Sequence, residues 1–436
     1  MVGLARSGVA AARALKANGQ VVFGVDSGEP GGTAVLRESG IDFETSTSGV
    51  DRLDGVATVV KSPGVPATAE VIRAAEERGI DVIGELELGW RLTPAPVVAV
   101  TGTNGKTTTT ELTTHLIRSA GRPASAAGNV GHPLCEVAME HAAGEDVGTV
   151  VCECSSFQLE DSELFSPEVA AFLNLRPDHL DRHGDMDRYR EAKLRIFANQ
   201  TDGDVAVLNA DEPALAGVKT DAAEIRFTVA GASDAEITLE GERIMVDGEP
   251  LIETREMKIL GRHNVANAMA GAAAALALGI EPAAVAEGLR SFPPVAHRYE
   301  PVAEIEGVLF INDSKATNVD ATLAALGSSD RRLHLILGGS SKGESFDALV
   351  PAVAGACRGI YLIGETADEI GEALEPAGVE IVRYCEDLEA AVSEAAGAAI
   401  PGEAVLLSPA CASFDQFADY EERGDAFRGY VEELDV

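Results

Sequence analysis

The sequence predicts an α/β protein of three domains built largely on parallel sheets. Short runs of β-branched and apolar residues alternate with helical patterns along all 436 residues, and this alternation is typical of α/β folds. Proline-containing stretches at 93–96 and 291–294 interrupt the pattern twice. We therefore expect domains at residues 1–93, 94–294 and 295–436.

The expected strands are apolar runs bounded by glycine, proline or charged residues. Between them lie helical patterns, of which the clearest are 9–18, 186–197, the alanine-rich 268–280 and a final helix within 415–436. In chain order the expected strands are 21–25, 56–60, 97–100, 149–152, 169–173, 205–208, 308–311, 333–337, 360–363 and 404–407.

The charge of the chain excludes some classes of partner. It carries 71 acidic against 34 basic residues, a formal net charge of -37, which disfavours nucleic acid and anionic membranes because both need phosphate neutralisation by cations. No apolar run is long enough to span a bilayer, and the N-terminus does not resemble a signal peptide. Six cysteines without CxxC pairs favour buried thiols over zinc or disulfides. We expect a cytoplasmic protein.

The clearest motif is TGTNGKTTT, residues 101–109, between an expected strand and an expected helix. The N–H groups of such a glycine turn and the positive end of the helix dipole attract phosphate oxygens. Lys106 would hold the terminal phosphates and Thr107 would bind magnesium. The common pattern has a further glycine where this chain has Val100, and a chance glycine turn is the alternative. The expected phosphate-binding residues are Gly102, Thr103, Asn104, Gly105, Lys106, Thr107 and Thr108.

Candidate metal ligands follow two neighbouring strands. Glu153 ends one strand, and the next runs into PDHLDRHGD, which contains Asp178, His179, Asp181 and His183. Carboxylates at the carboxyl edge of a parallel sheet can face the phosphate loop, and they suit magnesium, although a histidine ligand to magnesium is unusual. An edge glutamate and a solvated loop are the alternatives.

Lys193 lies on an apolar helical stripe with Met186, Tyr189 and Ile196. Burial would favour a neutral amine, and a neutral amine can add carbon dioxide to become a carboxylate that binds magnesium. From the periodicity alone, a lysine whose charged end extends to the solvent is the more common arrangement.

Two further groups of motifs remain. Polar residues gather in GRHNVANA (261–268), HRYE (297–300), INDSKATN (311–318) and LGGSSKG (337–343), although such residues also mark ordinary loops. Four of the eight lysines lie in glycine-rich or strand-end positions, which suggests local sites for anionic ligands. The N-terminal GLARSG could belong to a dinucleotide fold, but it lacks GxGxxG and supports NAD binding only weakly.

Together these motifs resemble the Mur ligase family, whose members form amide bonds in peptidoglycan precursors at the expense of ATP. The resemblance rests on TGTNGKTTT, ECSSFQLE, PDHLDRHGD, EAKLRIF, GRHNVANA, HRYE and NDSKATN, and spans the whole chain. Within the family, the resemblance is to the D-glutamate-adding branch, because of the segments GLARSGVA, KSPGVP and LSPACASFDQFADYEERG. It implies a Rossmann-like N-terminal UDP-sugar-binding domain, a central P-loop ATPase-type domain and a Rossmann-like C-terminal domain that binds the amino acid.

The resemblance also implies a role for individual residues. Catalysis would involve Lys106, Glu153, His179, Lys193 and Lys342, with Thr107, Glu153, His179 and carbamylated Lys193 as ligands of two magnesium ions. The nucleotide would also contact Asn264, Asn267, Arg298, Asp313 and Lys315. The UDP-sugar would contact Arg6, Ser7, Gly8, Asp26, Ser27, Ser62, Gly64, Asn129 and Ser155, and the amino acid would contact Thr317, Lys342, Ser413, Phe414 and Tyr420.

The implied reaction is the ATP-dependent addition of D-glutamate to UDP-N-acetylmuramoyl-L-alanine through an acyl phosphate, by a monomer. Another Mur-type or polyglutamate-type ligase, or a P-loop ATPase that forms no amide, would fit parts of the same pattern. One feature departs from the family. The chain begins at Met1 almost inside the first strand, so we expect that strand to be truncated or short.

Overall fold

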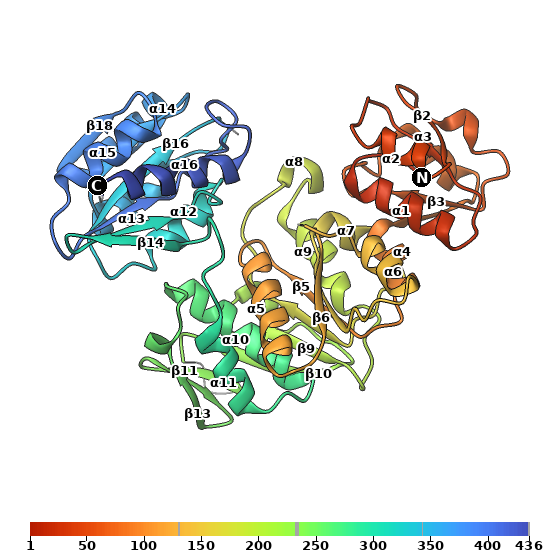
Figure 1. The fold of residues 1–436 in the computed structure, drawn as a ribbon, viewed down its shortest axis with the longest axis horizontal. Helices are drawn as coiled ribbons and strands as arrows, with labels where there is room; N and C mark the ends of the chain where they lie inside the picture. The colour runs from red at the N-terminus through yellow and green to blue at the C-terminus, as the bar shows by residue number, and fades with distance from the viewer. Residues whose placement is uncertain (130, 232–234, 342, 435–436) are drawn as a thin grey trace. The chain divides into compact units, whose positions relative to one another are not determined.

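The structure, a computed structural model, describes residues 1–129, 131–231, 235–341 and 343–434 (Figure 1). It confirms the α/β class. The chain forms two compact units, one of Met1–Glu253 with Asn267–Leu289 and the other of Thr254–Ala266 with Arg290–Val436. Most of the first two expected domains lie within the same unit, and the three-domain division stays a prediction.

The N-terminal segment of the first unit is a small parallel α/β layer. Val2 pairs in parallel with both Val25 and Lys61 as isolated bridges. The strand expected at the very start of the chain is therefore short, a single residue that pairs with β1 and β3. A Cβ atom at Gly8 would lie 1.8 Å from the carbonyl oxygen of Gly3, so glycine lets the helix approach the turn closely. The elements are α1 (Arg6–Ala17), β1 (Phe23–Val25), α2 (Thr33–Glu38), β2 (Asp42–Glu44), β3 (Thr58–Lys61), α3 (Glu70–Glu77), β4 (Asp81–Gly84) and α4 (Glu85–Leu92).

The rest of the first unit is built on a nine-stranded sheet of order β13-β12-β11-β10-β9-β8-β5-β7-β6. Strand β5 pairs in parallel with both β7 and β8, which puts the residues that follow these three strands at one edge. The strands are β5 (Val97–Thr101), β6 (Ala124–Gly128), β7 (Thr149–Glu153), β8 (Val169–Phe172), β9 (Val205–Asn209), β10 (Ala223–Thr228), β11 (Ile237–Glu240), β12 (Arg243–Val246) and β13 (Glu249–Glu253).

Helices cover this sheet, and small residues let two of them pack closely on α5. A Cβ atom at Gly271 would lie 2.4 Å from Leu112, and one at Gly288 would lie 2.6 Å from Leu116. The alanine-rich helix therefore packs closely beside the helix that follows β5. The helices are α5 (Lys106–Ser119), α6 (Leu134–Ala142), α7 (Ser156–Glu160), α8 (Leu180–His183), α9 (Met186–Leu194), α10 (Arg262–Ala277) and α11 (Pro282–Ser291).

The second unit contains a six-stranded sheet of order β14-β15-β19-β16-β17-β18. Its strands run parallel except β14, which pairs antiparallel with β15. The elements are β14 (Glu300–Ile305), β15 (Val308–Asn312), α12 (Val319–Leu326), β16 (Leu333–Gly338), α13 (Val350–Ala356), β17 (Cys357–Ile363), α14 (Ala367–Leu374), β18 (Ile381–Tyr384), α15 (Leu388–Ala398), β19 (Ala404–Leu407) and α16 (Tyr420–Glu433).

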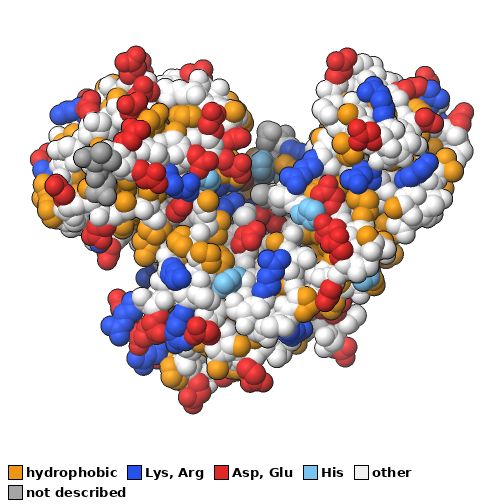
Figure 2. Space-filling view, viewed as in Figure 1, with side chains coloured by type: hydrophobic (Ala, Val, Ile, Leu, Met, Phe, Trp, Pro, Cys, Tyr) orange, Lys and Arg blue, Asp and Glu red, His pale blue; other side chains and the backbone are white. Residues whose placement is uncertain are grey.

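The positions of the acidic residues and the cysteines agree with what the composition predicts. Acidic side chains are spread over the face drawn in Figure 2. All six cysteines are free and five are buried, as expected, while Cys385 is half-buried. Among the described residues, no helix is both long and apolar enough to span a bilayer.

Candidate functional site

The phosphate loop joins β5 to α5, as the motif predicts. Gly102 and Gly105 have φ values of 157° and 85°, a region that favours glycine. A Cβ atom at Gly105 would also lie 2.3 Å from Oδ1 of Asn267, so no larger residue fits between the loop and α10. The two glycines therefore shape the turn, although Val100 replaces the usual first one.

The loop backbone is held from the neighbouring strand end. Asn174, just after β8, accepts from the N–H of Asn104 at 2.9 Å and donates its amide to the Asn104 carbonyl at 3.0 Å. The Thr103 N–H donates to the Asn174 carbonyl at 3.0 Å. These three hydrogen bonds, which the sequence motifs did not reveal, fix the loop before any ligand binds.

Lys106 begins α5, and its side chain bends back over the loop. Nζ donates to the carbonyl oxygens of Gly102 at 3.0 Å and Thr103 at 2.8 Å. An ammonium group thus lies directly above the glycine turn, where an anionic oxygen would gain from both the cation and the N-terminus of α5.

Glu153 meets the phosphate loop because Val100 and Glu153 are register partners in β5 and β7. Its buried carboxylate accepts from Thr107 Oγ1 at 2.5 Å and from Asn129 Nδ2 at 3.1 Å. Carboxylate and hydroxyl oxygens beside a phosphate loop are the donors that magnesium prefers, so these residues fit the ion. Among the described residues, no three His, Cys, Asp or Glu side chains form a ready metal cluster.

Lys193 is buried, so the interpretation of a solvent-extended lysine is wrong. Its side chain is 1% exposed, and Nζ donates to the Gly102 carbonyl at 2.8 Å. Burial, with a smaller contribution from the Lys106 cation, holds the pKa of Lys193 well below its usual range. The phosphate loop therefore packs against an amine that readily loses its proton.

Tyr189 links these groups and was noticed in the sequence only as part of an apolar stripe. Its hydroxyl lies 3.2 Å from Thr103 Oγ1, and Lys193 Nζ lies 4.8 Å from the centre of its ring. Burial raises the pKa of Tyr189, so the phenol stays protonated and can donate a hydrogen bond.

The two histidines of PDHLDRHGD differ in their surroundings. His179 precedes α8 with φ 52°, its side chain is 50% exposed, and its ring centre lies 4.8 Å from that of Phe157. His183 is buried, with Nε2 3.0 Å from Ser156 Oγ and its ring stacked on Phe157 at 5.3 Å. His179 can therefore reach a ligand from the solvent side, whereas His183 packs in the interior.

A cavity of about 520 Å³ opens in the N-terminal segment. Asp26, Ser27, Ser62 and Gly64 line it, while Arg6, Ser7 and Gly8 belong to the adjoining start of α1. Asp26 accepts from the N–H groups of Leu4 at 2.6 Å and Gly28 at 2.8 Å, so it organises the turns around the cavity.

The other two residues expected to contact the UDP-sugar, Asn129 and Ser155, lie elsewhere in the first unit. Asn129 donates to Glu153, as described above. Ser155 follows Glu153 by two residues and caps α7 in a capping box with Gln158. Both residues are therefore close to the phosphate-loop region.

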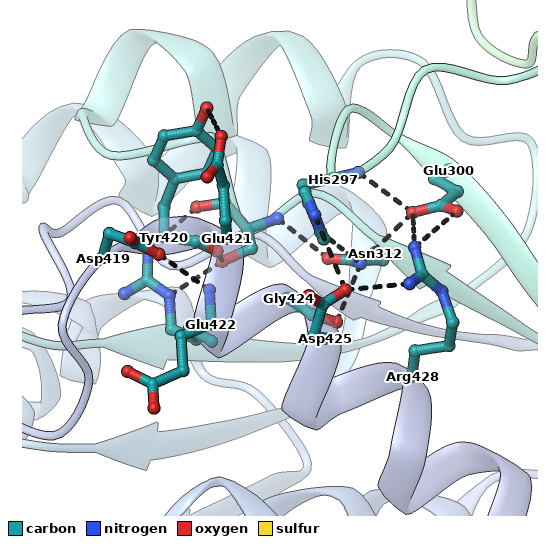
Figure 3. A network of polar contacts seen from close by, with 12 residues as sticks. His297, Glu300, Asn312, Asp419, Tyr420, Glu421, Glu422, Gly424, Asp425 and Arg428 are labelled. Atoms are coloured by element: carbon teal, nitrogen blue, oxygen red, sulfur yellow. Dashed lines mark hydrogen bonds and ion pairs between the residues drawn. The ribbon is translucent and has the colours of Figure 1, made fainter.

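In the second unit, the turn that carries Arg298 is fixed by a network around Asn312 (Figure 3). Asn312 Nδ2 lies 3.1 Å from His297 Nδ1 and donates to the Gly424 carbonyl at 3.1 Å. His297 has φ 60°, and a Cβ atom at Gly424 would lie 2.1 Å from its Nδ1. The network therefore ties the turn before β14 to β15 and α16.

Asp313 follows Asn312 and is half-buried. Its carboxylate accepts from the Tyr299 N–H at 3.1 Å and from Ser408 Oγ at 3.0 Å. Burial raises its pKa to about 7, and these two hydrogen bonds oppose the rise. Asp313 thus titrates near neutral pH.

The expected amino-acid residues lie around the start of α16. Lys315 Nζ lies 3.5 Å from the centre of the Tyr420 ring, and the backbone N–H of Thr317 donates to the Lys315 carbonyl. Ser413 is buried, whereas Phe414 is 73% exposed. Arg423, which sequence reasoning missed, donates to Ser314 and to the carbonyl oxygens of Cys411 and Ala412. It joins the two loops that carry these residues. Lys342 lies outside the described residues.

The remaining nucleotide residues divide between the units. Asn267 packs on Gly105 in the first unit, and buried Asn264, in the second, donates to the Leu260 carbonyl at 2.8 Å. Both lie on α10, which passes from one unit to the other.

Most of the chain matches known protein families and relatives. Residues 100–275 match the Mur ligase middle domain, and residues 297–411 match the glutamate ligase domain of Mur ligases. The chain is 43% identical over 447 residues to the UDP-N-acetylmuramoylalanine--D-glutamate ligase of Pelotomaculum thermopropionicum, covering 99% of this chain and 96% of that one. It is 40% identical over 452 residues to the ligase of the same name from Salinibacter ruber, covering 100% and 97%.

Solved structures share the fold at lower identity. The UDP-N-acetylmuramate-alanine ligase of Thermotoga maritima aligns over 99% of this chain and 98% of its own, with a TM-score of 0.62 and 22% identity. A pseudomurein peptide ligase type C from Methanothermus fervidus aligns over 99% of both chains, with a TM-score of 0.61 and 18% identity.

Proposed function

Because this chain belongs to the Mur ligase family, we propose that it joins D-glutamate to UDP-N-acetylmuramoyl-L-alanine with ATP as the energy source, in peptidoglycan precursor synthesis. Identities of 43% and 40% over nearly full length to ligases of that name support this substrate set. In the structure, the proposal is supported by four side chains that meet around one glycine turn, those of Lys106, Thr107, Glu153 and Lys193.

The chemistry requires activation of an inert acid. A carboxylate does not exchange its oxygen for an amine in water, so the alanyl carboxylate attacks the γ-phosphorus of ATP and ADP leaves. The attacking oxygen becomes the bridge of an acyl phosphate. The deprotonated amine of D-glutamate then adds to the acyl carbon, and the tetrahedral intermediate collapses by expelling phosphate.

The phosphate loop supplies positioning and charge for the first step. The loop N–H groups and Lys106 hold the triphosphate and reduce the repulsion between the two reacting anions. Glu153 and Thr107, with His179, would hold magnesium, which when bound neutralises charge that develops on the transferred phosphoryl group.

Lys193 has the properties that carbamylation requires. Its buried amine has a lowered pKa, and only the neutral amine adds carbon dioxide. We propose that the resulting carbamate replaces a cation with an oxygen ligand beside the phosphate loop, where it serves a second magnesium ion.

The remaining roles follow from placement. The cavity lined by Asp26, Ser27, Ser62 and Gly64 would receive the uridine diphosphate, with Arg6, Ser7, Gly8, Asn129 and Ser155 along the rest of the substrate. In the second unit, Asn264, Arg298, Asp313 and Lys315 would contact the nucleotide, and Thr317, Lys342, Ser413, Phe414 and Tyr420 would receive D-glutamate. We further propose the division at 93 and 294 into three domains, a monomeric state and a cytoplasmic location.

Phosphate release with each substrate omitted in turn tests the proposal. We expect rapid release only when ATP, UDP-N-acetylmuramoyl-L-alanine and D-glutamate are all present, with one amide product formed per phosphate. Equal release with ATP alone would indicate an ATPase that forms no amide. Product formation with another amino acid, but not with D-glutamate, would assign the chain to a different branch of the family.

A further inference from the structure

The loop that follows β3 is held to the middle part of the same unit by a group of residues that we call the junction clamp, namely Lys61, Phe157, Asp161 and Arg182. Lys61 ends β3, and its side chain is 2% exposed. Its Nζ donates to the Val65 carbonyl at 2.8 Å and lies 2.6 Å from Asp161 Oδ2. The ion pair therefore crosses from the loop to the residue that directly follows α7.

Arg182 makes the second connection. Its Nη1 donates to the Pro63 carbonyl at 2.8 Å, and its guanidinium carbon lies 4.0 Å from the centre of the Phe157 ring. The two cations thus bind the same loop, at the carbonyls of Pro63 and Val65. Arg182 is held by Phe157 of α7, and Lys61 by Asp161 just after that helix.

The loop held in this way contains Ser62 and Gly64, which line the N-terminal cavity on either side of Pro63. At the other end of the clamp, Arg182 lies in α8, which begins directly after His179. The clamp therefore joins a wall of the cavity to the segment that carries a proposed metal ligand.

One nitrogen of the Arg182 guanidinium, Nη2, is buried without a hydrogen-bond partner among the described residues. A buried donor without an acceptor is unfavourable, and an apolar side chain would avoid that cost. What holds this guanidinium in place is the bond from Nη1 to the Pro63 carbonyl and the contact with the Phe157 ring.

We propose that Arg182 is a positioning residue for the UDP-sugar substrate. It fixes the loop 61–65 against α7 and α8, so that the cavity and the His179 segment keep one spacing when the substrate spans them. The proposal rests on the proposed function, because it concerns the affinity for that substrate. Arg182 itself touches no reacting atom in this scheme.

The test compares Arg182→Met with Arg188→Met. Arg188 lies six residues further along, and its side chain is 74% exposed and pairs only loosely with Asp185. Binding of UDP-N-acetylmuramoyl-L-alanine is measured by isothermal titration calorimetry, and KM for each substrate and kcat by phosphate release. Circular dichroism and thermal melting verify that each variant is folded.

We expect Arg182→Met to raise Kd and KM for the UDP-sugar about tenfold, the size of effect expected for a lost hydrogen bond to a charged group. KM for ATP should stay within about twofold, and Arg188→Met should change neither. An unchanged Kd in folded Arg182→Met, or equal rises in KM for ATP and the UDP-sugar, would overturn the proposal.

Two further measurements keep the test decisive. Lys61→Met acts on the same loop from the other side and should raise the same Kd if Arg182→Met is unstable, whereas an unchanged Kd in folded Lys61→Met would count against the clamp. If the wild-type protein neither binds nor consumes the UDP-sugar, the proposed function fails. If it does both and the variants match it, only the clamp proposal fails.

Discussion

Replacing Asp313 by asparagine should stabilise the second unit above neutral pH. Asp313 accepts hydrogen bonds from the Tyr299 N–H and from Ser408 Oγ. An asparagine oxygen can keep the first bond. Its amide can donate to Ser408, whose hydroxyl can turn towards Thr322 Oγ1, 3.2 Å away. The substitution therefore removes a charge while both hydrogen-bond positions stay occupied, and its one electrostatic loss is the attraction to the Arg298 cation.

The magnitude follows from the pKa. Burial raises the pKa of Asp313 from 3.8 to about 7, so between these values the folded protein binds more protons than the unfolded chain. The stability that protonation gives is full below pH 3.8 and is lost as the pH rises through 7. At about 1.36 kcal/mol per pH unit, the variant should gain up to about 4 kcal/mol above pH 7.

Urea unfolding between pH 5 and pH 8, followed by circular dichroism, measures this difference. The free energy of unfolding of Asp313→Asn relative to wild type should grow by roughly 1.4 kcal/mol per pH unit up to pH 7 and then level off. Glu365→Gln, at an exposed site in the same unit, should show no such trend. A constant difference between Asp313→Asn and wild type from pH 5 to pH 8 would refute a raised pKa for the Asp313 carboxyl.

Three other predictions concern the phosphate loop and the net charge. Lys106→Ala should lower kcat at least about 100-fold because the cation above the glycine turn is lost, whereas Lys219→Ala, at an exposed site, should match wild type in a phosphate-release assay. Lys193→Ala should be nearly inactive and recover in part with an added short-chain carboxylic acid, which would supply the missing oxygen ligand; wild-type rates without the acid would exclude the bridging role. Because the net charge is -37, 1 M NaCl should raise Tm relative to 0.05 M by roughly 2–4 °C per kcal/mol of repulsion screened, and a lower Tm in salt would show that repulsion is not limiting.

The sequence predicts those parts of the fold and site that depend on local pattern. The phosphate loop follows from nine adjacent residues, and strands such as Val97–Thr101 and Ala404–Leu407 lie where the apolar runs place them. That Glu153 lies near Thr107 could be predicted, because the carboxyl ends of parallel strands meet at one edge of a sheet. The C-terminal helix lies within its expected range, 415–436, and begins at Tyr420 because Asp419 caps it.

Other features depend on packing between distant segments. Lys193 is buried because α9 lies against the phosphate loop, and helical periodicity alone cannot distinguish that from a lysine that reaches the solvent. Asn267 lies beside Gly105 because Gly271 lets α10 approach α5. The short strands from Ala223 to Glu253 carry too many polar residues for an apolar-run criterion to detect.

Arg423 illustrates the same limit in the second unit. Its side chain is 1% exposed, although an arginine in a charged helical segment is normally expected at the surface. It is buried because its guanidinium donates to acceptors in two loops. One loop provides the hydroxyl and the carbonyl of Ser314, more than a hundred residues earlier in the chain, and the other provides the carbonyls of Cys411 and Ala412. Such contacts exist only once the fold has formed.

Oxygen transfer tests the central claim, that ATP held at the start of α5 activates the substrate carboxylate. UDP-N-acetylmuramoyl-L-alanine labelled with ¹⁸O in its alanyl carboxylate is converted in the presence of ATP and D-glutamate, and the released phosphate is analysed by mass spectrometry. The acyl phosphate route predicts one ¹⁸O atom in each phosphate formed by wild type. Amide product accompanied by phosphate without ¹⁸O would contradict it.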